Sequence, residues 1–136
     1  MFYKFHGVRA LIWHDGKLLI LRRASAETSD PGLWDLPGGK IESDETAVEA
    51  IQREVLEEAG IGADMLNIKD LYGLILAKFD SKDKLVIAVF NCESQTELVK
   101  LNSEHSKYDW IDSAEVAVYD TGRILRELPI FKKKAG

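Results

Sequence analysis

Hydrophobic and polar residues alternate in two short runs near the start of the sequence, and turn residues separate the runs. Residues 5–13 place apolar side chains at every second position, and residues 17–22 read KLLILR. Between the runs stand residues 14–16, HDG, a composition that is typical of a tight turn. The pattern therefore predicts a β-hairpin made from two half-buried strands.

A different period follows in residues 39–61, which read GKIESDETAVEAIQREVLEEAGI. At about 100° per residue, the helical period groups apolar side chains on one face, which predicts a buried stripe. The stripe consists of Val48, Ile51, Val55 and Ala59. Ser43 or Asp44 can cap the start of this helix, and Gly60 supplies the left-handed position that ends it. We expect one helix of about four turns.

The rest of the chain returns to strand patterns before a final helix. Residues 68–79 and 85–92 predict two strands joined by the turn FDSKDK, and the second is apolar enough for the interior of a sheet. Residues 108–111 predict a short strand, residues 113–119 a helical turn, and residues 121–131 an amphipathic helix. Strands on both sides of a central helix indicate the α/β class with a mixed sheet.

Composition narrows the class of protein. A chain of 136 residues with 46% hydrophobic and 30% charged residues fits a single globular domain over residues 1–136. No apolar run reaches the length of a membrane span and no charged-then-apolar leader opens the sequence, so we expect a cytoplasmic protein. The net charge of −5 argues against a surface that coats nucleic acid. The single Cys92 excludes a disulfide within the chain and a thiolate metal cluster.

Three carboxylates crowd the end of the predicted helix, at Glu54, Glu57 and Glu58. Like charges four residues apart repel by about 0.2–0.5 kcal/mol, and the helix dipole disfavours anions in the last turn by about 0.3–1 kcal/mol. A hard divalent cation with oxygen ligands relieves both terms. The alternative is a solvated acidic face. Arg53 stands four residues before Glu57 and can pair with it.

The spacing around these carboxylates decides between the two interpretations. It resembles, position for position, the Nudix box: a glycine, five residues, a glutamate, seven residues, then R-E-aliphatic-x-E-E-x-G-aliphatic. The matching residues are Gly39, Glu45, Arg53, Glu54, Val55, Glu57, Glu58, Gly60 and Ile61. The resemblance implies a Nudix-type α/β/α sandwich with a mixed central sheet and a loop-helix-loop box. It also implies a hydrolase that uses Mg²⁺, with Mn²⁺ as a substitute.

The resemblance assigns roles to particular residues. The implied metal ligands are a carbonyl of Gly39 and the carboxylates of Glu54, Glu57 and Glu58. Many Nudix enzymes carry a further glutamate in a late loop, as a metal ligand or a base, and Glu104 stands in such a loop here; an ordinary loop acid is the alternative. Glu54 or Glu104 would take a proton from the attacking water, and Arg53 would orient Glu57. Glu45 is expected to brace the loop by hydrogen bonds.

Three cations are candidates for substrate binding: Arg22, Arg23 and Lys40. Solvated surface charge is the competing interpretation for all three. The segment RRA at the end of a strand, followed by a short loop and PGGKIE, looks like the MutT-like branch of the family that cleaves oxidised guanine triphosphates.

The expected activity is therefore pyrophosphohydrolysis of a small-molecule nucleotide. The first expectation is that a nucleoside triphosphate, in ordinary or oxidised form, is cleaved to monophosphate and pyrophosphate. Three alternatives stay open: an ADP-sugar or dinucleoside polyphosphate hydrolase, a nucleotide-sensing Nudix module without catalysis, and removal of an RNA cap or transcript end. The net negative charge and the lack of a basic stripe count against the third. A sensor of this kind usually lacks box acids, and all of them are present in this sequence. The oligomer is expected to be a monomer or a homodimer.

Overall fold

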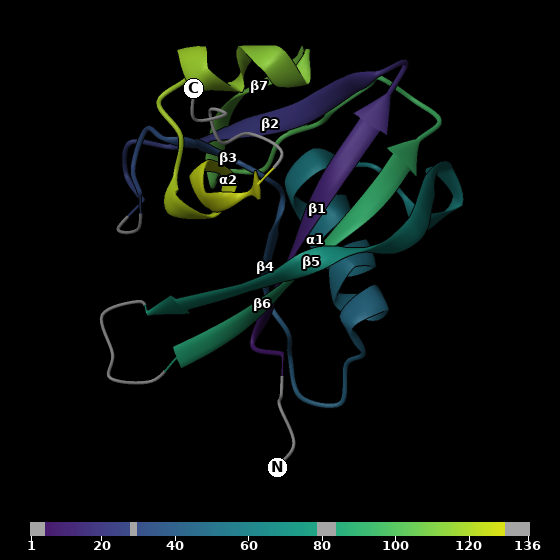
Figure 1. Cartoon of the computed structure of the whole chain (residues 1–136). Helices are drawn as coiled ribbons and strands as arrows, with labels where there is room; N and C mark the ends of the chain where they lie inside the picture. Colours follow the sequence, from purple (N-terminus) through teal and green to yellow (C-terminus); the bar gives the residue numbers. More distant parts are fainter. Residues whose placement is uncertain (1–4, 28–29, 79–83, 130–136) are drawn as a thin grey trace.

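The N-terminal hairpin forms as expected but opens soon after its turn. The computed structural model describes residues 5–27, 30–78 and 84–129 of the chain (Figure 1). Strands β1 (Gly7–His14) and β2 (Lys17–Arg23) meet through Asp15 and Gly16, whose φ angles of 48° and 77° are those of a type I′ turn. They pair only next to the turn, in the register Trp13–Leu18 and His14–Lys17. Beyond these pairs the two strands separate.

Two short strands fill the opening between β1 and β2. Strand β4 (Gly38–Lys40) pairs antiparallel with the start of β1, and β3 (Trp34–Asp35) pairs antiparallel with the end of β2. Strand β7 (His105–Ile111) covers the other edge of β2. The opening therefore places β4, the first half of β1 and the end of β2 around one site.

The other half of the sheet is built on β1. Strand β6 (Lys84–Ser94) runs parallel to β1, and β5 (Leu66–Lys78) pairs antiparallel with β6 after the short 3₁₀ turn η1 (Ala63–Met65). The strand order β3-β2-β1-β6-β5 makes a mixed sheet, with β6 in its interior as the apolar run predicts. The predicted turn between the two strands lies at residues 79–83, outside the described residues.

Helix α1 (Ala47–Ala59) has both of its ends fixed by local sequence. Gly60 ends it with φ 71°, as predicted. The prediction of Ser43 or Asp44 as N-cap is wrong, because Thr46 caps the helix and forms a capping box with Glu49. Asp44 belongs to the preceding turn, where its φ is 65°.

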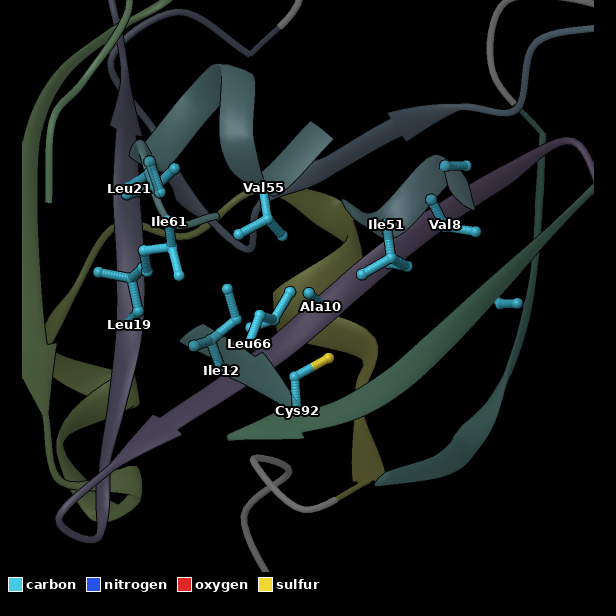
Figure 2. Packing of buried hydrophobic residues seen from close by; sticks show 13 residues of the cluster. Val8, Ala10, Ile12, Leu19, Leu21, Ile51, Val55, Ile61, Leu66 and Cys92 are labelled. Carbon is cyan, nitrogen blue, oxygen red and sulfur yellow. The ribbon is translucent and has the colours of Figure 1, made fainter. Parts of the chain in front are cut away.

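The core has one cluster on each face of the sheet. Under α1 the cluster joins Ile51 and Val55 to the even-numbered side chains of β1, and Figure 2 shows this packing around Cys92. Val48, expected on the buried stripe, is 42% exposed. The buried face of the helix is rotated toward Glu58, which is buried and accepts a hydrogen bond from Gly38 of β4. The rotation brings an acid of the box against the sheet.

The second cluster lies on the opposite face, under the 3₁₀ turn η2 (Ser113–Val118) and helix α2 (Arg123–Glu127). Helix α2 is shorter than predicted, because Leu128 precedes Pro129 and takes extended angles (φ −68°, ψ 130°). Residues 130–131 of the predicted helix lie outside the described residues. Trp34 is partly buried and packs against this cluster, edge-on to Tyr119. No helix in the described part of the chain is long and apolar enough to span a membrane.

Candidate metal and phosphate site

A buried carboxylate stands at the end of α1. Glu58 is 3% exposed, and its Oε2 accepts a hydrogen bond from the Gly38 backbone N–H at 2.9 Å. Burial raises the pKa of Glu58 to about 8, assisted by the nearby charge of Glu54 and opposed by the Gly38 hydrogen bond. A carboxyl group in this position favours its neutral form until a positive charge arrives beside it.

The two glycines below the helix permit this approach. Gly38 has φ 151°, and a Cβ there would collide with the carbonyl oxygen of Val8. At Gly39 a Cβ would lie 2.6 Å from Oε1 of Glu54. Glycine at position 38 therefore lets strand β4 lie against β1, and glycine at position 39 leaves room for the carboxylate of Glu54.

Two residues from a distant part of the chain complete the cluster. One ligand atom each of Glu58, Glu104 and His105 lies within 4.8 Å of the others. Pairing of His105 with Arg23 and a hydrogen bond from Ala24 N–H to the Glu104 carbonyl (2.8 Å) hold this segment beside β2. His105 is 7% exposed, and burial, with the charges of Arg23 and Arg9, lowers its pKa to about 4. Its imidazole is therefore neutral at neutral pH and has a lone pair to offer.

Glu54 and Glu57 occupy different environments although both belong to the predicted ligand set. The Glu54 side chain is 13% exposed, and burial raises its pKa despite a 2.8 Å hydrogen bond from Arg53. Glu104 is close enough to raise that pKa further. The Glu57 side chain is 55% exposed, and its carboxylate is outside the group formed with Glu104 and His105. Glu54 is also outside that group of three, but it is close enough to raise the pKa of Glu58, and it is less exposed than Glu57.

Arg53 has different main partners from the one expected. Its Nε and Nη2 donate to the two oxygens of Glu45, at 2.7 and 3.0 Å, while its Nη1 is 3.5 Å from Glu57. It also donates to Glu54 and, at 3.0 Å, to the Lys40 carbonyl. Arg53 thus orients Glu54 and the loop more directly than Glu57. Glu45 is a hydrogen-bonding brace as expected, and its bonds to Arg53 lower its pKa to about 2.

Comparison with known proteins agrees with this geometry. A family model described as NUDIX domain matches residues 4–128. The chain belongs to the Nudix family. The predicted α/β/α sandwich is confirmed, and family membership makes the protein a hydrolase of phosphoanhydrides.

Individual relatives span most of the chain. A MutT-like protein of Streptomyces ambofaciens is 33% identical over 107 residues, which are 79% of this chain and 62% of that protein's length. The nucleoside triphosphatase NudI of Escherichia coli (strain SE11) is 31% identical over 117 residues, 81% of this chain and 83% of NudI. The crystal structure of the MutT protein from Methanosarcina mazei Go1 has a TM-score of 0.75 at 36% identity, covering 85% of this chain and 81% of that one.

The donor set of this Nudix site fits a divalent cation. Nudix hydrolases generally use such metals, and the cluster offers carboxylate oxygens and one neutral imidazole. Carboxylates suit Mg²⁺ and Mn²⁺, and an imidazole is also accepted by Mn²⁺ and the later transition metals. The buried Glu58 favours its neutral form, which a bound cation would reverse. We find the residues compatible with a metal, and the Gly39 carbonyl as a ligand stays a prediction.

The predicted substrate cations differ in their contacts and in their exposure. Arg22 donates from Nε to the Gly32 carbonyl at 3.0 Å, and Arg23 lies 3.5 Å from Glu27. Lys40 is exposed at the end of β4. The structure adds Arg9, which sequence reasoning missed: it influences the pKa of both Glu58 and His105. Its only signal in the sequence is a charged residue inside an otherwise apolar strand.

Proposed function

We propose that this Nudix hydrolase cleaves a nucleoside triphosphate, in ordinary or oxidised form, to monophosphate and pyrophosphate with Mg²⁺. The observation that carries the proposal is the convergence of Glu58, Glu104 and His105 next to Glu54 of the Nudix box. Two relatives support the substrate class, since one is named MutT-like and the other a nucleoside triphosphatase. Mn²⁺ is the expected substitute.

The residues divide the chemistry among them. Glu58, Glu104 and His105 hold the cation. Glu54, Glu57 and the Gly39 carbonyl are further ligands. The cation, when bound, supplies positive charge for the phosphate oxygens and makes water more acidic. The buried Glu58 contributes a fixed position, because the Gly38 N–H holds its second oxygen. Lys40, Arg22 and Arg23 assist from the rim of the site.

We assign the general base to Glu54 and keep Glu104 as the alternative. Glu54 has a pKa raised by burial, which makes it a better base than an exposed carboxylate, and Arg53 fixes its orientation. In the proposed step a bond forms between the water oxygen and phosphorus, and Glu54 takes the proton. The bond between phosphorus and the bridging oxygen breaks, and pyrophosphate leaves with the electron pair.

A nucleotide panel tests the proposal. The purified protein is incubated with ordinary nucleoside triphosphates, 8-oxo-dGTP, ADP-ribose, NADH and diadenosine polyphosphates, with Mg²⁺ or Mn²⁺. We expect release of pyrophosphate from a triphosphate, at a rate about 10²–10⁴-fold lower with the Glu54→Gln variant. Preferred cleavage of ADP-ribose or a dinucleoside polyphosphate would replace the substrate class. Nucleotide binding without turnover of any compound would replace the enzyme by a sensor.

A further inference from the structure

We propose that Arg9 is a phosphate-binding residue, whose guanidinium receives phosphoryl oxygens of the substrate beside the metal carboxylates. This inference rests on the proposed function, because it needs a polyphosphate at the site. It adds a residue of β1 that lies outside the Nudix box. We therefore expect Arg9 to contribute more to phosphate binding than Arg22, Arg23 or Lys40.

The first observation is an unfilled donor. Arg9 Nε is buried and has no hydrogen-bond partner, and it is the one such side-chain nitrogen or oxygen in the described part of the chain. Nη1 donates to the carbonyl of the neighbouring Val8 at 3.0 Å. A buried charged donor without an acceptor is costly, so structures keep one mainly where an unseen partner binds.

The second observation is position. Arg9 stands opposite Gly38 in the β1–β4 pairing, and a Cβ on Gly38 would lie 2.9 Å from Arg9 Cδ. The same Gly38 donates its N–H to Glu58. Gly38 is therefore approached by Arg9 from β1 and by the carboxylate of Glu58 from α1.

A simple counter-charge does not account for this arrangement. The titratable groups whose pKa Arg9 influences come from three elements, with Glu58 on α1, Asp35 on β3 and His105 on β7. Within the described residues, no ion pair of 4.0 Å or less involves Arg9.

The nearby carboxylates are occupied elsewhere. Asp35 Oδ1 accepts from the backbone N–H groups of Leu36 and Leu125, at 2.8 and 3.2 Å, and Glu58 Oε2 accepts from Gly38. Both acids are therefore held by main-chain donors, while Nε of Arg9 has no hydrogen-bond partner. The unpartnered Nε of Arg9 can therefore be satisfied by the oxygen acceptors of a third group.

Phosphate matches this donor better than a carboxylate ligand would. The guanidinium fork binds two oxygens of one phosphoryl group, and arginine keeps its charge in a partly buried place. A polyphosphate that reaches the metal residues passes next to Arg9, because Glu58 and Arg9 share Gly38 as a neighbour. Arg22 is less suited, since its Nε already donates to Gly32.

Binding measurements without turnover test the assignment. Titration calorimetry with Mg²⁺ compares inorganic pyrophosphate, a non-hydrolysable nucleoside triphosphate and the unphosphorylated nucleoside. Arg9→Gln should weaken both phosphate ligands by about 10–100-fold, as expected for loss of charged hydrogen bonds, and leave the nucleoside unchanged. Arg9→Lys should fall between, because it keeps the charge and loses the fork. Arg126→Gln, on the exposed side of α2, is the matched control.

A second readout separates binding from folding. Pyrophosphate should raise the melting temperature of wild type and of Arg126→Gln, and the rise should be lost in Arg9→Gln even if its ligand-free melting temperature has changed. Pyrophosphate and triphosphate affinities of Arg9→Gln within twofold of wild type would overturn the assignment. So would an equal loss for the nucleoside. If the wild type hydrolysed no nucleotide but Arg9→Gln still weakened pyrophosphate binding, the proposed function would be refuted. The assignment of Arg9 to phosphate binding would then be kept.

Discussion

The polar side of α1 borders two regions, and their charged groups are partnered in opposite ways. Around Arg53 every strong donor has a partner: both oxygens of Glu45, one oxygen of Glu54 and the Lys40 carbonyl. We call these residues the Arg53 bracket. At the other end, Glu58, Glu104, His105 and Arg9 come close without ion pairs among them within the described residues. We call these four residues the open end.

The pKa shifts of the two regions have opposite meanings. In the Arg53 bracket, the hydrogen bonds to Glu45 raise the pKa of Arg53 and those to Arg53 lower that of Glu45 to about 2, so both charged forms are stabilised. In the open end, burial raises the pKa of Glu58 and lowers that of His105, so both neutral forms are favoured. The Arg53 bracket is therefore held in place by its own hydrogen bonds, whereas the open end still needs ions that bind from solution.

The largest expected effect comes from the residue that joins the two regions. Glu54→Gln keeps an oxygen for the Arg53 hydrogen bond and removes the base, so kcat should fall by about 10²–10⁴-fold. Steady-state kinetics on the preferred nucleotide measure the loss, and circular dichroism checks that the fold is kept. A variant within tenfold of wild type would transfer the role of base to Glu104, for which Glu104→Gln is the matched experiment.

A smaller loss is expected inside the Arg53 bracket. Arg53→Lys keeps a positive charge but cannot reach Glu45, Glu54 and the Lys40 carbonyl together. Residues that orient metal ligands typically cost 10–100-fold when changed, so we expect a fall in kcat of about that size and weaker metal binding. Metal titration of the protein without nucleotide separates the two effects. Unchanged metal affinity and rate would show that the bracket does not position Glu54.

These contrasts show which parts of the site could be predicted from the sequence. The box carboxylates and Gly60 were predictable, because their spacing lies within one helix and the loop before it. The N-cap was missed although T-x-x-E stands at residues 46–49, since several polar residues competed for the position. The short α2 also followed from a visible signal, the residue before Pro129.

The open end depended on tertiary structure. Glu104 was proposed only from family resemblance, and its approach to Glu58 requires β7 to pair with β2. Arg9 reaches the site because the β1–β2 hairpin opens and β4 enters the gap. No periodicity in the sequence encodes that separation of the strands. The partner of Arg53 was equally out of reach, because the loop folds back to bring Glu45 eight residues away into contact.

Changing the pH tests the bracket through stability. Glu45 has a folded pKa of about 2, below the ordinary value of 4.5, so its ionised form stabilises the folded state. That contribution is complete above about pH 4.5 and is lost as the pH falls toward 2. We expect Glu45→Gln to have a lower melting temperature than wild type at pH 6 and a difference that narrows on acidification. A difference that is constant with pH would mean that packing, not charge, explains Glu45.

The smallest effect is expected at the side chain of Lys40, because Lys40 contributes to the Arg53 bracket through its backbone carbonyl. Its carbonyl accepts a hydrogen bond from Arg53, while its side chain is exposed. Lys40→Ala keeps the carbonyl, so the bracket should be intact, and kcat should not change. An exposed charge near a phosphate contributes about 0.2–1 kcal/mol, which limits the rise in KM to about fivefold. The rise should also disappear at high salt, because solvent ions screen exposed charges. A larger rise in KM that persists at high salt would show that Lys40 reaches the phosphates directly. Phosphate binding would then be shared between Arg9 in the open end and Lys40 at the end of β4.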